Sequence, residues 1–156
     1  MLKGRLIDLT HKLFPGKEER KLELKTFFIE EVLPNIRREK DVWYIMQEIT
    51  FLDHIGTHIE APYHYLKHGK DASEIPLERL VGEAVILNFS HKKPGEKIDV
   101  DDLEQYGKNV SEGDIVLIRT DRSRFWNTKD YHQRPFLTND AVKWLIERKI
   151  SCLGID

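Results

Sequence analysis

Three histidines and a glutamate lie in one short stretch of the sequence, Asp53 to Tyr65, which reads DHIGTHIEAPYHY. Imidazole nitrogens and carboxylate oxygens are side-chain ligands that suit Zn²⁺, Mn²⁺ and Fe²⁺. The same stretch contains Gly56 and Pro62, two residue types that interrupt regular backbone structure. These residues at this spacing predict a metal site built on an irregular backbone.

The backbone between the first two histidines decides which side chains can share an ion. His54 and His58 are four residues apart, a spacing that would place them on one face of a helix. Gly56 and its β-branched neighbours disfavour a helix here. In an extended chain, His58 and Glu60 lie on one face, whereas His54 would be roughly 13 Å from His58 at about 3.3 Å per residue. We therefore expect the backbone to bend at Gly56.

Two imidazoles and a carboxylate leave a coordination position open, as in catalytic rather than structural metal sites. A divalent ion held there, with Zn²⁺ foremost and Mn²⁺ or Fe²⁺ as alternatives, lowers the pKa of a bound water toward about 7. Pro62 could turn His64 back over the ion, where His64 would accept and return a proton. Hydrolysis is the reaction class that this arrangement predicts. The alternative is that these histidines only cap turns or form hydrogen bonds at the edge of a core.

Two neighbours of the three predicted ligands are assigned other roles. His68 lies in the polar stretch Lys67 to Lys70, which is typical of a surface loop. Asp53 is expected at a strand end, or as a hydrogen-bond acceptor to an imidazole, rather than as a direct ligand. The predicted ligand set is therefore His54, His58 and Glu60.

The elements that must position this stretch indicate a mixed α/β protein. Six segments have the composition or alternation of strands: Leu6–Leu9, Leu22–Ile29, Val42–Leu52, Ala84–Phe89, Ile115–Ile118 and Ile150–Ile155. Helices are expected near Val100–Tyr106 and over Asn139–Arg148, the latter with Thr138 as its N-cap, and a short helical turn over Ser73–Leu80. The run Phe27–Leu33 fits either a strand or a helix. In the second half, the order strand, helix, strand predicts parallel crossovers.

Length, charge and cysteine content narrow the class of protein. With 156 residues, 40% of them hydrophobic, residues 1–156 fit one domain with its own core. The 25 Lys and Arg and the 27 Asp and Glu are mixed along the chain, which argues against nucleic acid as a partner. Cys152 is the only cysteine, so an internal disulfide is excluded and a reducing cytoplasm is favoured. Short apolar runs and the lack of a signal-peptide pattern predict a soluble protein without a membrane partner.

The segment HIGTHIEAPYH resembles the HxGTHxDxPxH signature of the cyclase-like metal-dependent hydrolases, which include kynurenine formamidase and isatin hydrolase. Three more segments resemble that family in the same order, so that the likeness covers nearly the whole chain: LIDLTHKLFPG, GDIVLIRTD and FLTNDAVKWLIERKISCLGID. The resemblance implies a swivelling β/β/α domain, assembled as a homodimer or larger homo-oligomer. It also implies metal ligands at His54, His58 and the acidic position, here Glu60, with His64 as the catalytic acid/base.

The sequence departs from this family pattern in two respects. Glu60 stands where the family more often has aspartate, which keeps the type of ligand but adds one methylene. Family members also continue past the segment Gly154 to Asp156 and supply a later histidine and glutamate. The expectation is therefore a domain that lacks its C-terminal part.

The function expected from the residues and the resemblance together is hydrolysis of a small cyclic amide or an N-formyl amide, with a metal-bound water as the nucleophile. The alternative is a non-catalytic protein that binds metal or a small ligand on the same scaffold. Selectivity would come from loops such as Arg122 to Tyr131, whose Phe125, Trp126 and Tyr131 fit either pocket walls or core anchors.

Overall fold

The structure is a computed structural model that describes residues 4–156. It falls into two compact units, of which the first ends at Glu60 and the second begins at Ala61. In chain order the helices and strands are β1 (Leu22–Phe28), α1 (Ile29–Val32), β2 (Ile45–Phe51), β3 (Ala84–Asn88), β4 (Lys97–Ile98), α2 (Val100–Tyr106), β5 (Ile115–Arg119), β6 (Phe136–Leu137), α3 (Asn139–Glu147) and β7 (Cys152–Ile155). Short 3₁₀ helices cover Pro62–His64, Ala72–Glu74, Leu77–Leu80, Arg122–Phe125 and Lys129–His132. The mixed α/β class is confirmed, and the single domain of residues 1–156 stays a prediction.

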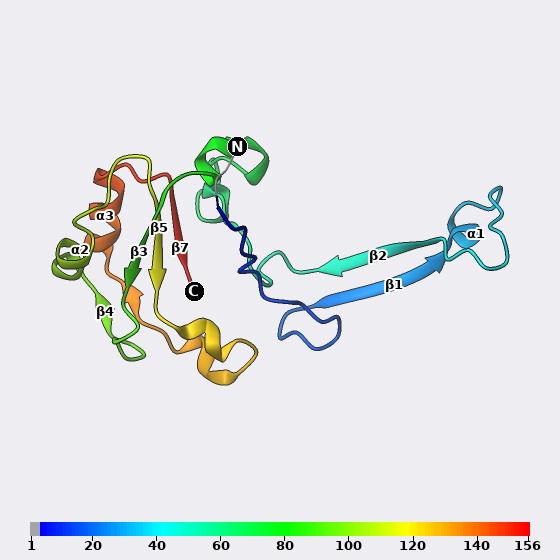
Figure 1. The fold of residues 1–156 in the computed structure, drawn as a ribbon, viewed down its shortest axis with the longest axis horizontal. Coiled ribbons are helices and arrows are strands. Elements are labelled where there is room, and N and C mark those ends of the chain that lie inside the picture. Colours follow the sequence, from blue (N-terminus) through cyan, green and yellow to red (C-terminus); the bar gives the residue numbers. More distant parts are fainter. Residues whose placement is uncertain (1–3) are drawn as a thin grey trace. The chain divides into compact units, whose positions relative to one another are not determined.

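The first unit contains an antiparallel ribbon of β1 and β2, with α1 at the tip where the chain turns back (Figure 1). Leu24 pairs with Ile49, and Lys25 pairs with Glu48. Because paired residues share a face, one face of the ribbon is largely apolar and the other largely polar. Both predicted strands are confirmed with shorter ends, and the ambiguous run Phe27–Leu33 divides into strand and helix.

The strand predicted at Leu6–Leu9 is wrong. These residues belong to none of the strands in the described part of the chain. Leu6 and Leu9 are 90% and 80% exposed. Their apolar composition is a local signal, but a strand also requires a neighbour whose backbone accepts its hydrogen bonds, and no strand among residues 4–156 pairs with this segment.

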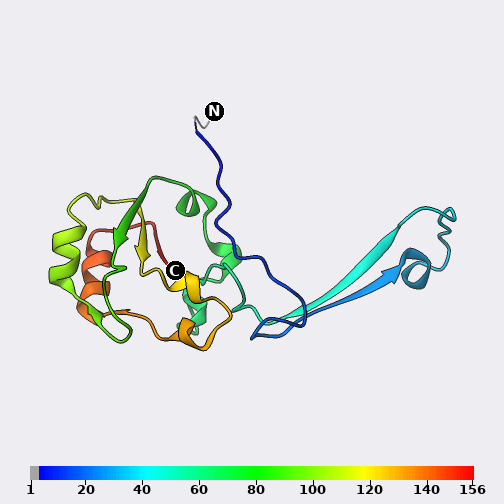
Figure 2. The same cartoon turned by 60° about the horizontal axis from the view of Figure 1, so that its bottom comes forward.

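The second unit is built on a parallel sheet with the strand order β3-β5-β7. Helices α2 and α3 lie side by side on one face of this sheet (Figures 1 and 2). β4 and β6 form a separate short parallel pair. The predicted parallel crossovers, from β3 through α2 to β5 and from β5 through α3 to β7, are therefore confirmed.

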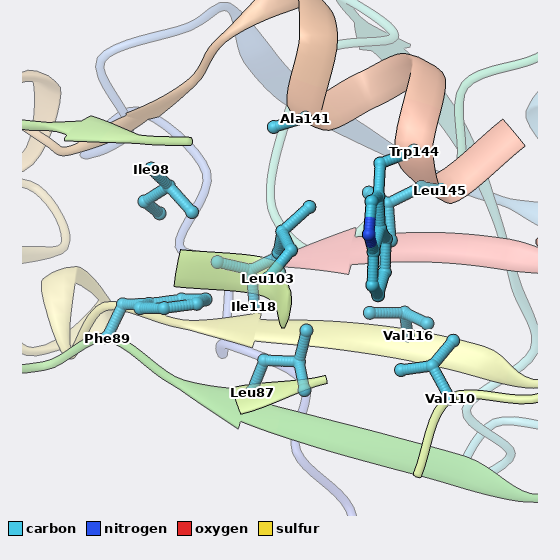
Figure 3. Close-up of a cluster of buried hydrophobic side chains, with 10 residues drawn as sticks. All are labelled: Leu87, Phe89, Ile98, Leu103, Val110, Val116, Ile118, Ala141, Trp144 and Leu145. Carbon is cyan, nitrogen blue, oxygen red and sulfur yellow. The ribbon is translucent and has the colours of Figure 1, made fainter. Parts of the chain in front are cut away.

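The hydrophobic core of the second unit lies between the sheet and these two helices (Figure 3). Side chains of the helices, such as Leu103 and Trp144, face side chains of the strands, such as Val116. Thr138 caps α3, because its Oγ1 accepts a hydrogen bond from the backbone N–H of Ala141 at 3.2 Å, as predicted. Burial of this apolar surface is the main favourable term in holding the unit together.

Two elements of the second unit differ from the sequence prediction. The helical turn expected over Ser73–Leu80 is two 3₁₀ helices, because Pro76 forces Ile75 into an extended conformation between them. The strand expected over Ile150–Ile155 is confirmed, but β7 begins later, at Cys152; it pairs with β5, and its Leu153 and Ile155 are exposed. Across the described residues, no helix combines the length and apolar character that crossing a membrane requires.

Candidate metal centre

The backbone bends at Gly56, between the first two histidines of the cluster. Gly56 has φ +62°, in the left-handed region that glycine adopts without the steric cost other residues pay. The stretch lies beyond the end of β2 at Phe51. The rings of His54 and His58 are 5.3 Å apart between centroids and meet edge to face. The predicted bend is confirmed. It brings the two histidine rings closer together than a straight strand would allow.

This bend brings together His54, His58 and Glu60. Each offers one ligand atom, and the three atoms lie within 4.8 Å of one another. Glu60 Oε1 is 3.0 Å from His54 Nδ1 and 3.5 Å from His58 Nε2. Two ligands of a tetrahedral Zn²⁺ ion are about 3.3 Å apart when their bonds are about 2.0–2.1 Å, so the two spacings from Glu60 suit one ion. The three side chains are between 31% and 42% exposed, which leaves access from solvent.

A hydrogen bond fixes the ring of His58. Its Nδ1 lies 2.8 Å from the backbone oxygen of Gly56. Because a carbonyl oxygen can only accept, Nδ1 carries a proton and donates it, and in the neutral ring Nε2 presents a lone pair. That lone pair faces Glu60 Oε1 at 3.5 Å, so a cation between the two atoms would have a ligand atom on each side. Metal-binding histidines commonly donate their other N–H to a carbonyl in this way, so the donor set fits a divalent metal.

Two neighbouring side chains lie outside the group of three ligands. Asp53 comes just after β2, at a strand end as predicted, and its side chain is exposed. Its Oδ1 is 3.9 Å from His54 Nε2, which is too long for the hydrogen bond that the sequence suggested. His68 is exposed in a loop, as predicted.

His64, the predicted acid/base, is the last residue of the 3₁₀ helix Pro62–His64. It is exposed, and its ring meets that of Tyr65 edge to face with centroids 4.4 Å apart. His64 belongs to the second compact unit, whereas the three predicted ligands belong to the first. Its catalytic role stays a prediction.

Two of the three aromatic residues in the loop Arg122 to Tyr131 pack on each other, and the third packs on an arginine. The rings of Trp126 and Tyr131 meet edge to face at 5.0 Å, and the guanidinium of Arg122 lies 4.1 Å from the centre of the Phe125 ring. Trp126 and Tyr131 are half-buried. These contacts favour the role of anchors within the loop, and the role of pocket walls stays a prediction.

The sequence did not predict the contacts that an N-terminal segment makes beside the bend at Gly56. The backbone N–H of His11 donates to Thr57 Oγ1 at 3.4 Å. Two methyl carbons of Leu13 lie 3.0 Å from the position that a Cβ on Gly56 would take. The nearest sequence expectation, the strand at Leu6–Leu9, ends before His11 and gave no sign of this contact.

Several curated proteins are similar in sequence to this chain. The kynurenine formamidase of Geobacillus thermodenitrificans is 37% identical over 111 residues, and that of Bacillus cytotoxicus is 29% identical over 110 residues. Each match covers 70% of this chain and 49% of the relative. This chain thus spans about half the length of the curated relatives it matches.

Solved structures are similar in fold. A protein described as a potential metal-dependent hydrolase with cyclase activity matches with a TM-score of 0.70 and 27% identity, over 96% of this chain and 66% of that one. Isatin hydrolase A from Labrenzia aggregata, bound to benzyl benzoate, matches with a TM-score of 0.71 over 97% of this chain and 67% of that one. At 23% identity, this second likeness shows the fold alone.

Residues 7–156 match the family described as "Putative cyclase". The chain therefore belongs to the Putative cyclase family.

Proposed function

We propose that the protein is a metal-dependent hydrolase of a small cyclic amide or an N-formyl amide. The observation that carries this proposal is the convergence of His54, His58 and Glu60 on a space that suits one ion. The kynurenine formamidases among its relatives support an amide as the substrate. The isatin hydrolases of similar fold suggest that the amide can be cyclic.

In this proposal His54, His58 and Glu60 hold the ion, Zn²⁺ foremost and Mn²⁺ or Fe²⁺ as alternatives. A divalent ion bound there would polarise the amide carbonyl and lower the pKa of a water ligand. The hydrogen bond between His58 Nδ1 and the Gly56 carbonyl directs Nε2 toward Glu60. His64 is proposed to hold the proton taken up during attack and to return it to the leaving nitrogen, a task suited to imidazole.

The test is hydrolysis by protein purified without chelator and analysed for bound metal. The substrates are a panel of aryl formamides and cyclic amides. We expect release of formate or of the ring-opened acid, loss of this activity on dialysis against a chelator, and its return with Zn²⁺ or Mn²⁺. Metal binding without hydrolysis of any panel member would favour the alternative, a non-catalytic metal-binding protein. Protein that takes up no metal would contradict both.

Three broader properties belong to the same proposal. The fold is proposed to be a swivelling β/β/α domain over residues 1–156, which the TM-scores of about 0.70 support. The proposed compartment is the cytoplasm, because a single cysteine permits no internal disulfide. The substrate is a small molecule, and the balanced charge gives no reason to propose nucleic acid as a partner.

We further propose that the protein is a homodimer or larger homo-oligomer, and the ribbon of β1 and β2 supports this. On its apolar face Leu24, Ile49 and Phe51 are 42%, 57% and 56% exposed. A two-stranded ribbon is marginally stable alone, and contiguous exposed apolar side chains commonly mark interfaces. Covering this face with a second copy would stabilise the ribbon.

Ile49→Lys is expected to weaken self-association at least about 10-fold, because it places a charge among apolar side chains at the proposed interface. Thr50→Lys is the matched control, since Thr50 pairs with Glu23 on the polar face of the same strand. Sedimentation velocity over a range of concentrations measures the effect. A monomeric wild type, or equal behaviour of the two variants, would contradict an interface on the apolar face.

A further inference from the structure

We propose that Leu13 is a positioning residue for the candidate metal centre and acts through Gly56 on the ring of His58. This inference rests on the proposed metal site and adds a residue that lies outside the ligand motif. It concerns only contacts within the first compact unit. In chemical terms, an apolar side chain determines which ring nitrogen of a metal-binding histidine carries the proton and which way the ring points.

Leu13 packs directly against the backbone of Gly56. A Cβ added to Gly56 would lie 3.0 Å from both Leu13 methyl carbons and 3.2 Å from Leu13 Cγ. Leu13 is half-buried, whereas Leu9, in the same extended segment, is 80% exposed. Of these two leucines, Leu13 is the one that contacts the bend.

The segment that carries Leu13 is anchored on both sides of it. Before it, the His11 N–H donates to Thr57 Oγ1 at 3.4 Å, next to the bend. After it, the Gly16 N–H donates to the backbone oxygen of Leu22 at 3.0 Å, at the start of β1. These two bonds restrict the backbone on either side of Leu13, the first more weakly because it is long.

The orientation of the Gly56 peptide decides which nitrogen of His58 faces the other ligands. The Gly56 carbonyl accepts from His58 Nδ1 at 2.8 Å, and this leaves Nε2 to face Glu60. Glycine has wide backbone freedom, so Gly56 alone would not keep one peptide orientation. Leu13 restricts that freedom by occupying the space into which the bend could relax. Loss of its side chain would loosen the carbonyl, and with it the tautomer of His58.

The test compares Leu13→Ala with Leu9→Ala, which removes the same side chain from an exposed site in the same segment. Metal-free protein labelled with ¹⁵N reports the tautomer of His58, with His58→Ala used to assign its signals. We expect the Nδ1-protonated form in the wild type and in Leu9→Ala, and a mixture of both tautomers in Leu13→Ala. Competition against a chromophoric chelator is expected to show about 10-fold weaker Zn²⁺ binding for Leu13→Ala, the lower end of what outer partners of metal ligands contribute. Leu13→Met, which conserves volume, should restore both properties.

An unchanged His58 tautomer and unchanged Zn²⁺ affinity in folded Leu13→Ala would overturn the inference. If circular dichroism shows that Leu13→Ala unfolds, Leu13→Val supplies a smaller truncation for the same two measurements. Failure of the proposed function is separable from failure of this inference. A wild type that binds no Zn²⁺ would contradict the metal site, while the tautomer in metal-free protein still decides whether Leu13 positions His58.

Discussion

His58→Ala is expected to weaken Zn²⁺ binding by at least about 100-fold, beyond the roughly 10–100-fold that loss of an outer partner of a metal ligand costs. The variant leaves only His54 and Glu60 from the proposed set, and two ligands do not hold Zn²⁺ against water as three do. It also removes the ring whose Nδ1 is fixed by the Gly56 carbonyl, so no other side chain can take over that orientation. Equilibrium competition with a chromophoric chelator, together with the metal content after gel filtration, measures the loss.

His68→Ala is the matched control, because it makes the same chemical change at an exposed loop residue outside the cluster. It should bind Zn²⁺ as the wild type does. If His58→Ala keeps wild-type affinity, or if His68→Ala loses as much, the ligand assignment fails. Circular dichroism of the metal-free variants checks that the comparison is between folded proteins.

The candidate site could be predicted largely because its constraints are local. Two histidines and a glutamate at these spacings cannot share an ion on a straight strand, and Gly56 is the residue between them that bends most easily. The contact of Leu13 with Gly56 could not be predicted in the same way. It depends on where an extended segment with no strand partner crosses the bend, and no periodicity encodes that.

Local signals also decided which parts of the fold could be predicted. The order of strand, helix and strand restricts how the chain can connect parallel strands, so the crossovers of the second unit could be predicted. The strand expected at Leu6–Leu9 was wrong because an apolar composition does not by itself supply a partner strand.

His64→Ala is expected to leave Zn²⁺ affinity within about threefold of the wild type and to lower kcat for amide hydrolysis by roughly 100-fold or more, the usual cost of losing a general acid/base. The reason is its place in the chain, after Pro62 and beyond the three proposed ligands, at the exposed end of a 3₁₀ helix. A residue that only moves a proton affects turnover, whereas a ligand affects the affinity for the ion. Zn²⁺ titration and steady-state kinetics on the same preparation separate these effects.

Two further measurements make the assignment of His64 specific. Added imidazole should restore part of the kcat lost in His64→Ala, because a small base can occupy the space of the missing ring and carry its proton. His68→Ala, a histidine replaced at another exposed position of the same unit, should keep full turnover and gain nothing from imidazole. If His64→Ala instead loses Zn²⁺ as completely as His58→Ala, His64 is a ligand and the proton must be moved by another group. If His64→Ala keeps both affinity and turnover, His64 has no part in the reaction, and the metal centre has to be explained without it.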